Sequence, residues 1–277
     1  MGQILVGTSS WQLHRGFYPA GLPPTERIRY YAAHFRLVEV DSTFHQLMPP
    51  RNPAAWVERT PGDFVFDVTA FRSLTRHAPP VTGDLTDDFA AFRESIRPLR
   101  EAGKLGAVLF RFPHRFHLSP WNRAYLAQCR ERMPDEPIAV EFRHLSWLAG
   151  GEAERTLAFL RGLGIVYVAV DASPTGDASI PPLAAVTEPS LAYVRLHGRA
   201  DADGRPGEPP RSGYRYRPDE IVDWVARVER LAAEASAVHV LFNTCGASLE
   251  NARALMDRLG LLPPEPAAPS QLGLPLT

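Results

Sequence analysis

The sequence predicts one α/β domain in which eight parallel strands, joined by helices, close into a barrel. Eight short apolar runs alternate with helical patterns along the chain, and no linker or shift in composition separates them. The runs are apolar at successive positions, which is typical of strands buried on both faces of a parallel sheet. The chain has 277 residues, which is the usual length of one such barrel.

The strands are expected in the apolar runs, most of which carry polar residues toward their C-terminal ends. These runs cover residues 4–10, 37–44, 64–70, 106–112, 138–144, 165–172, 191–198 and 237–243. An open doubly wound sheet is the alternative. It is disfavoured because no GxGxxG turn follows the first run, where the sequence reads GTSSW.

The helices are expected between the strands, where apolar residues recur at helical spacing. These patterns cover residues 25–35, 52–61, 87–103, 119–133, 152–164, 217–235 and 247–259. The sixth connection, residues 173–190, is rich in proline and lacks such spacing. The barrel is therefore expected to occupy residues 1–262, and residues 263–277 to form a Pro-rich, extended or disordered tail.

The composition is that of a globular protein, with 45% apolar and 22% charged residues. The net charge of −1 argues against a nucleic-acid coat or a membrane-surface binder, since both need a basic excess. The two cysteines, Cys129 and Cys245, are too few for a disulfide framework. The sequence has neither a signal-peptide pattern at its start nor an apolar run of bilayer length, so a soluble cytoplasmic protein is expected.

Polar residues collect at the C-terminal ends of the strands, where such barrels carry their active sites. We call this open end of the barrel the mouth. Side chains two positions apart on a strand face the same way, so Glu141 and Arg143 are expected to face the mouth together. Buried charges are expensive unless they are paired or functional. For the third strand, the pattern leaves open whether Asp67 or Phe66 faces inward. The residues expected to face inward are Glu39, Asp41, Arg111, Glu141, Arg143, Asp171, Arg195, His197 and Asn243.

Six short motifs resemble those of the domain of unknown function seventy-two family, the YecE-like proteins. The motifs are GTSSW (7–11), FYP (17–19), VEVDSTF (38–44), TPGDFVFDV (60–68), EFRHLSW (141–147) and YVRLHGR (193–199). They occur in the family's order, and the resemblance runs from about residue 4 to about residue 258. It implies a TIM-type barrel, in agreement with the strand count, and an activity that is not established.

The chain departs from the family pattern at three places. Asp41 stands where the family usually has asparagine, and Thr69 stands where a lysine is common. The last strand ends in FNTCG, which keeps Asn243 but not the amide residue that often follows it. Since Lys104 is the only lysine of the chain, a Schiff-base mechanism is not expected.

The mouth predicts an enzyme that uses acid/base chemistry on a small anionic substrate, such as a phosphorylated or acidic sugar. His197 is the candidate acid or base at neutral pH. Glu141 and Asp171 are expected to lie close together as its carboxylate partners, with Glu39 as a further candidate. The reaction would be that of a hydrolase, an isomerase or a lyase, without an organic cofactor.

The arginines of the mouth predict an anionic ligand, because a guanidinium group matches the geometry of phosphate and carboxylate. Arg143 and Arg195 are the expected clamp. Trp11 and Trp147 are candidates for apolar walls, and Tyr214 for a lid or stacking group. The ligand-binding candidates are Arg143, Arg195, His144, Asp41, Trp11, Arg111, Tyr214, Asn243 and Trp147.

Two other classes of function stay open. A non-catalytic module could bind a nucleotide or nucleic acid through the tyrosines and arginines of residues 211–218, although the net charge argues against a nucleic-acid partner. A metal-dependent phosphodiesterase or isomerase would hold an ion with Glu39, Glu141, Asp171 and His197. Nearby arginines would repel a cation, so no metal is assigned. No membrane partner is expected, and the sequence does not predict the oligomeric state.

Overall fold

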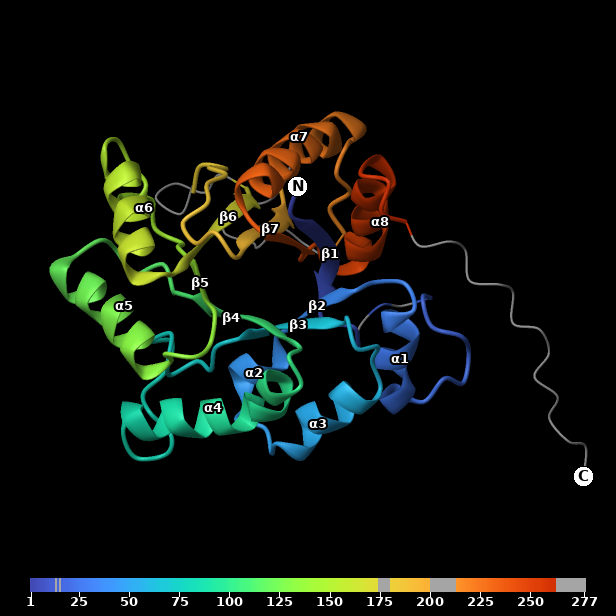
Figure 1. Ribbon diagram of the computed structural model, residues 1–277, viewed down its shortest axis with the longest axis horizontal. Helices are drawn as coiled ribbons and strands as arrows, with labels where there is room; N and C mark the ends of the chain where they lie inside the picture. Colours follow the sequence, from blue (N-terminus) through green and yellow to red (C-terminus); the bar gives the residue numbers. More distant parts are fainter. Residues whose placement is uncertain (13, 15, 174–179, 200–212, 263–277) are drawn as a thin grey trace, which may run out of the picture.

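Eight parallel strands close into a barrel in the computed structural model of the chain, and helices surround it (Figure 1). The structure describes residues 1–12, 14, 16–173, 180–199 and 213–262. Each strand pairs in parallel with the next, and β8 pairs with β1, so the predicted barrel is confirmed. The strands are β1 (Gln3–Ser9), β2 (Leu37–Val40), β3 (Val65–Thr69), β4 (Leu105–Arg111), β5 (Ile138–Glu141), β6 (Val166–Ala172), β7 (Ala192–Gly198) and β8 (Ala237–Phe242).

The helices follow the strands in chain order, and all except α2 correspond to expected helices. They are α1 (Arg27–Ala32), α2 (Ser42–His45), α3 (Arg51–Glu58), α4 (Leu85–Glu101), α5 (Pro120–Arg132), α6 (Glu152–Leu163), α7 (Pro218–Glu234) and α8 (Ser248–Arg258). The second strand is shorter than expected, because the chain leaves it after Val40 and turns into α2. The tail predicted for residues 263–277 lies outside the described residues.

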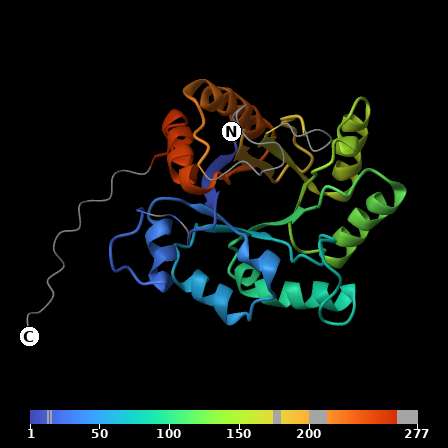
Figure 2. The same ribbon diagram turned by 180° about the vertical axis from the view of Figure 1, so that it is seen from behind.

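Local sequence signals fix several helix ends. Ser119 precedes α5, and its hydroxyl accepts a hydrogen bond from the backbone N–H of Asn122, while Pro120 occupies the first helical position. α6 ends at Gly164, which adopts the left-handed conformation with φ of 60°. These two helix ends therefore lie where the sequence supplies a cap. Figure 2 shows this ring from behind, with α8 beside the N-terminal strand that it packs against.

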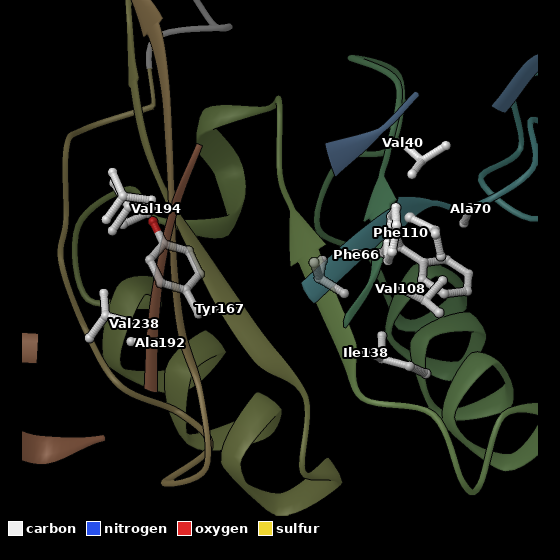
Figure 3. Packing of buried hydrophobic residues seen from close by; sticks show 14 of the residues in the cluster. Val40, Phe66, Ala70, Val108, Phe110, Ile138, Tyr167, Ala192, Val194 and Val238 are labelled. Carbon is white, nitrogen blue, oxygen red and sulfur yellow. The ribbon is translucent and has the colours of Figure 1, made fainter. Parts of the chain in front are cut away.

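The apolar core has two parts, one on each face of the sheet. The larger part lies between the strands and the helices and contains Phe66, Val108 and Phe110 (Figure 3). The smaller part fills the barrel interior with residues such as Leu109 and Val168. Because Phe66 and Val68 pack outward, Asp67 faces the interior, which settles the choice that the sequence left open.

Charged side chains lie among the apolar residues of the barrel interior. Glu39, Asp67, Glu141, Arg195 and His239 are all buried. A buried charge is strongly unfavourable unless it is paired and hydrogen-bonded, so these residues must find partners inside the barrel. Within the residues that the structure describes, no helix is long and apolar enough to cross a membrane.

Candidate functional site

Arg195 of β7 lies at the centre of the barrel mouth and holds two carboxylates. Its Nη2 donates to Oε1 of Glu39 on β2 at 2.7 Å, and its Nη1 donates to Oε2 of Glu141 on β5. All three side chains are at most 2% exposed. The carboxylates that meet are thus Glu39 and Glu141, linked across the barrel by one guanidinium group.

The charges of this cluster stabilise one another. Burial opposes ionisation of Glu141, but Arg195 and His197 outweigh it and hold the pKa of the Glu141 carboxyl well below its ordinary value. Burial likewise disfavours the cation of Arg195, but Glu141 and Glu39 outweigh it and raise the pKa of Arg195. Both terminal nitrogens of Arg195 donate to these carboxylates, and its Nε is buried without a partner among the described residues. Arg195 thus organises the carboxylates, and its expected part in an anion clamp stays a prediction.

His197 stands two residues after Arg195 on β7, and its side chain is 18% exposed. Its Nε2 lies 3.4 Å from Glu141 Oε2, and its Nδ1 lies 3.2 Å from Nδ2 of Asn243, which follows β8. When the Asn243 amide donates to Nδ1, the proton of the neutral ring resides on Nε2 and faces Glu141; when Nη1 of Arg195, 3.4 Å from Nε2, donates instead, the proton resides on Nδ1. A histidine oriented by a carboxylate on one side and an amide on the other is arranged for proton transfer.

Glu39 receives further support from side chains that the sequence did not single out. The hydroxyl of Ser9 on β1 donates to Glu39 Oε1 at 3.0 Å, and the hydroxyl of Tyr193 on β7 donates to Oε2 at 3.2 Å. Counting by twos along β1 and β7 places both residues on the inward face. Their role depends on contacts with another strand, which the spacing alone does not reveal.

A second buried pair lies deeper in the barrel. Nδ1 of His239 on β8 is 3.0 Å from Oδ2 of Asp67 on β3. β4 passes this pair at Gly106, where an added Cβ would lie 2.4 Å from the Asp67 carboxylate and 2.7 Å from the His239 ring. Only glycine therefore fits there, and the barrel interior is charged well below its mouth.

Two arginines supply positive charge at the mouth itself. Arg111 is the last residue of β4, and its Nε is buried without a hydrogen-bond partner among the described residues. Arg143 is exposed just after β5 and forms no salt bridge within the part of the chain that the structure describes. The two are close enough that Arg143, together with burial and Arg195, disfavours the cation of Arg111 and lowers its pKa. An anion between them would relieve this repulsion.

His77 and Phe44 lie beside these arginines on the rim. The two rings are 5.0 Å apart, and the Arg111 guanidinium lies 5.5 Å from the centre of the Phe44 ring. Burial and the positive charges of Arg111, Arg115 and Arg143 lower the pKa of His77 to about 4, so its ring is neutral at pH 7. His77 comes from the loop after β3, where no periodic pattern marks a functional position.

Asp41 adds a carboxyl to the other side of the mouth. Asp41 is exposed to solvent, but neighbouring protein atoms cover part of its carboxyl group. This partial burial and the charge of Glu39 raise the pKa of Asp41. His45 and Arg111 oppose the rise only in part. Asp41 therefore lies near Arg111, as the expected inward set required, and holds a proton more readily than an ordinary aspartate.

Asp171 does not face the mouth, so its expected inward orientation is wrong. On β6 it stands in register with Leu196, which belongs to the outer core. Its Oδ2 accepts from the indole Nε1 of Trp224 on α7 at 2.9 Å, and its Oδ1 accepts from Nε of Arg199 at 2.9 Å. Asp171 therefore ties β6 to α7 and is not a partner of Glu141.

Replacing Asp171 by alanine tests this assignment. The variant should lose about 1.5–3 kcal/mol of unfolding free energy, because a buried charged acceptor of two hydrogen bonds disappears. It should bind anions as the wild type does. Urea unfolding and sulfate titration measure the two effects, with Asp219→Ala, at an exposed ion pair, as the control. Loss of anion binding without loss of stability would return Asp171 to the site.

The two tryptophans proposed as apolar walls pack in the outer core instead. Trp11 is buried with its ring 5.2 Å from that of Trp56 on α3. Trp147 is fully buried, stacks on Phe142 at 4.3 Å and donates from Nε1 to the carbonyl of Phe116. Neither ring is open to a ligand. Both tryptophans belong to motifs at strand ends, but a residue there can also face the helices, as these two do.

Tyr214 and His144 are also held by protein contacts. The Tyr214 hydroxyl donates to the carboxylate of Glu220 at 2.9 Å, and its side chain packs against Gly198, whose φ of 82° and crowded Cα require glycine. This ring is not poised as a stacking lid, and residues 211 and 212 of the proposed nucleotide-binding segment lie outside the described residues. His144 Nδ1 is bonded to Ser146 Oγ at 2.8 Å, and its ring lies beside His114 and His117.

The four residues considered for a metal are not assembled into one site. Asp171 points away, while Glu39 and Glu141 are bonded to Arg195. Among the described residues, no group of three or more His, Cys, Asp or Glu side chains is arranged to hold a metal ion. The donor set of the metal-dependent alternative is therefore not supported.

Comparisons with known proteins agree with this architecture. A family model described as "Protein of unknown function DUF72" matches residues 5–272. The chain is 32% identical over 271 residues to the UPF0759 protein YunF of Bacillus subtilis (strain 168), covering 93% of this chain and 95% of that protein. It is 28% identical over 180 residues to the UPF0759 protein YecE of Escherichia coli (strain K12), covering 62% and 60%.

Solved structures of similar proteins share the fold. A DUF72 family protein from Enterococcus faecalis V583 has a TM-score of 0.87 and 29% identity, covering 96% of this chain and 100% of that chain. Another from Thermotoga maritima MSB8 has a TM-score of 0.78 and 31% identity, covering 93% and 99%. These similarities support the barrel fold and do not identify a substrate.

Proposed function

Because the chain belongs to the DUF72 family, whose description leaves the activity open, we propose a function from the barrel mouth. The protein is an enzyme that moves a proton to or from a small anionic substrate held at the C-terminal end of the barrel. It needs no organic cofactor for this chemistry. One observation carries the proposal: an oriented, partly exposed His197 shares the mouth with Arg111, whose buried Nε lacks a partner among the described residues.

Arg111 and Arg143 form the anion site in this proposal. A buried guanidinium N–H without an acceptor is unfavourable, and an anionic oxygen would satisfy it. Arg143 is exposed and approaches from the neighbouring strand. His77 is neutral at pH 7, so it can donate or accept a hydrogen bond there without adding charge. These features favour a phosphate, sulfate or carboxylate group on the ligand.

His197 is the acid/base group. Glu141 is held in its ionised form and faces Nε2, so it stabilises the imidazolium ion that forms when His197 takes up a proton. Asn243 contacts Nδ1, and a ligand oxygen or nitrogen replacing the amide there would complete the transfer. Arg195 is the shared counter-ion of the two buried carboxylates and keeps them in place. Hydrolysis, isomerisation and elimination all require this step.

Arg111→Met is the direct test of the anion site. Titration with sulfate should show that the variant binds about 10–100-fold more weakly than the wild type, because charge-assisted hydrogen bonds are lost. Arg97→Met serves as the control, since Arg97 is exposed and pairs only with surface glutamates of α4. Equal sulfate affinity in all three proteins would contradict the proposed anion site.

A further inference from the structure

A second pocket lies on the rim beside the mouth, among the loops that follow β3 and β4 and the start of α5. Its volume is about 380 Å³, and Arg76, Arg115, Phe116, His117 and Trp121 are among its lining residues. This volume falls within the range of small-molecule sites, roughly 300–1,000 Å³. The loops after the strands build it, so it lies on the same face of the barrel as the proposed site.

Trp121 is the unusual member of this pocket. It stands in the first turn of α5 and is 83% exposed, although tryptophan is usually well buried. Phe116, in contrast, is buried and stacks on Phe112 at 3.9 Å and on Trp147 at 5.7 Å. The pocket thus combines a rigid aromatic floor with an exposed indole that has a free face for a planar group.

Two guanidinium groups border the same pocket and are held in place. The guanidinium carbon of Arg76 lies 3.8 Å from the centre of the Tyr125 ring, a cation–π contact that holds Arg76 in place. Arg115 donates from Nη2 to the backbone carbonyl of Arg76. Two guanidinium groups and an exposed indole at one pocket favour a planar, electron-rich ring, which can stack on the indole while the guanidinium groups donate to acceptors at its edge.

Two short series of contacts lead from the residues of the pocket toward the mouth. On one side, Arg76 precedes His77, whose ring contacts Phe44, and Phe44 lies under Arg111. On the other side, the His117 ring is 6.0 Å from that of His144, which follows Arg143. Burial and the charges of Arg111, Arg115 and Arg143 all lower the pKa of His77, so this neighbour of Arg76 places the rim pocket near both arginines of the proposed anion site.

We propose that the rim pocket is a second subsite for the same ligand. It takes the planar heteroaromatic ring of a nucleoside monophosphate whose phosphate lies between Arg111 and Arg143. The ring stacks on Trp121, with Arg76 and Arg115 at its edge. This inference rests on the proposed function, because it assumes that an anionic group occupies the mouth.

The test compares three ligands that share a phosphate: inorganic phosphate, ribose 5-phosphate and adenosine 5′-monophosphate. Calorimetric titration of the wild type should give at least about tenfold tighter binding for the nucleotide than for ribose 5-phosphate, since base stacking adds to affinity. Trp121→Ala should remove this gain and leave the other two affinities unchanged. Trp121→Phe should retain most of it.

The controls separate the inference from the function on which it rests. Val222→Ala removes another exposed apolar side chain, on α7, and should bind all three ligands as the wild type does. If phosphate and ribose 5-phosphate bind but the base adds no affinity, or if Trp121→Ala leaves the nucleotide affinity unchanged, the second subsite is refuted alone. If none of the three ligands binds, the anion site itself is refuted, and the second subsite with it.

Discussion

Replacing Arg195 by methionine is expected to remove about 3–5 kcal/mol from the unfolding free energy, the largest effect of any single substitution in the mouth. Methionine fills much of the same space, so the loss comes from charge and not from a cavity. Glu39 and Glu141 would each remain buried without their shared counter-ion. A pair of buried carboxylates without a cation is far less favourable than the intact triad.

Urea unfolding at pH 7 measures this effect, and two further variants interpret it. Arg97→Met, which breaks an exposed helical ion pair, should change stability by no more than about 0.5 kcal/mol. The triple variant Arg195→Met, Glu39→Gln, Glu141→Gln should recover part of the loss, because no buried charge is left uncompensated. A single Arg195→Met variant as stable as the wild type would show that the carboxylates are not charged partners of this arginine.

The same variant should respond to pH in a defined direction. In the wild type the folded-state pKa of Glu141 lies well below the ordinary value of 4.5. Its stabilising contribution is therefore present above pH 4.5 and is lost as the pH falls further. Without Arg195, burial instead raises the pKa of Glu141, and protonation as the pH falls relieves the unpaired charge. The stability difference between wild type and variant should thus shrink as the pH is lowered from 7 toward 5.

The barrel could be predicted from the sequence because strand and helix periods are local properties. Apolar runs such as residues 106–112 predict buried strands, and Ser119 followed by Pro120 predicts the start of a helix. The prediction failed where the chain changes direction. Residues 41–44 look like more strand, but Ser42–His45 form a helical turn beyond Val40. Apolar pattern alone does not mark that end.

The site was predicted in part, and the failures have one physical origin. Counting by twos placed Glu39, Glu141, Arg195 and His197 correctly on the inward face, because a strand alternates regularly. Asp171 failed because its register on β6 points it outward, where Trp224 and Arg199 satisfy it. A strand end buried on both sides can carry a polar residue on either face, and one sequence does not say which.

The side chains that Arg195 pairs with could not be predicted from the sequence. Arg195 was expected to bind a ligand. Its partners in the structure are Glu39 and Glu141, which lie on β2 and β5, far from β7 in the sequence. Glu39 and Arg195 are separated by more than half the chain. Pairing of this kind follows from barrel closure, in which strands distant in sequence face a common interior. In the function that we propose, ligand binding therefore falls to Arg111 and Arg143, while Arg195 holds the buried carboxylates.

His197→Asn is expected to lower kcat by about 10²–10⁴-fold on any substrate that the ligand titrations identify, because asparagine cannot take up or release a proton near neutral pH. Binding should change little, since Arg111 and Arg143 are untouched. Sulfate affinity should therefore stay within about threefold of the wild type. Steady-state turnover and calorimetric titration of the same protein preparations separate the two effects.

Asn243→Ala provides a graded comparison, because it keeps the imidazole and removes only the amide contact to Nδ1. Its turnover should fall less than that of His197→Asn, and its pH–rate profile should shift, whereas the profile would stay in place if Asn243 were only a packing residue. Unchanged turnover in His197→Asn would remove the histidine from the chemistry. The acid/base role would then pass to Asp41, a carboxyl in the mouth whose pKa is raised by burial and by the charge of Glu39. The proton is thus transferred either by His197 or by Asp41, and the turnover of His197→Asn and Asn243→Ala distinguishes the two.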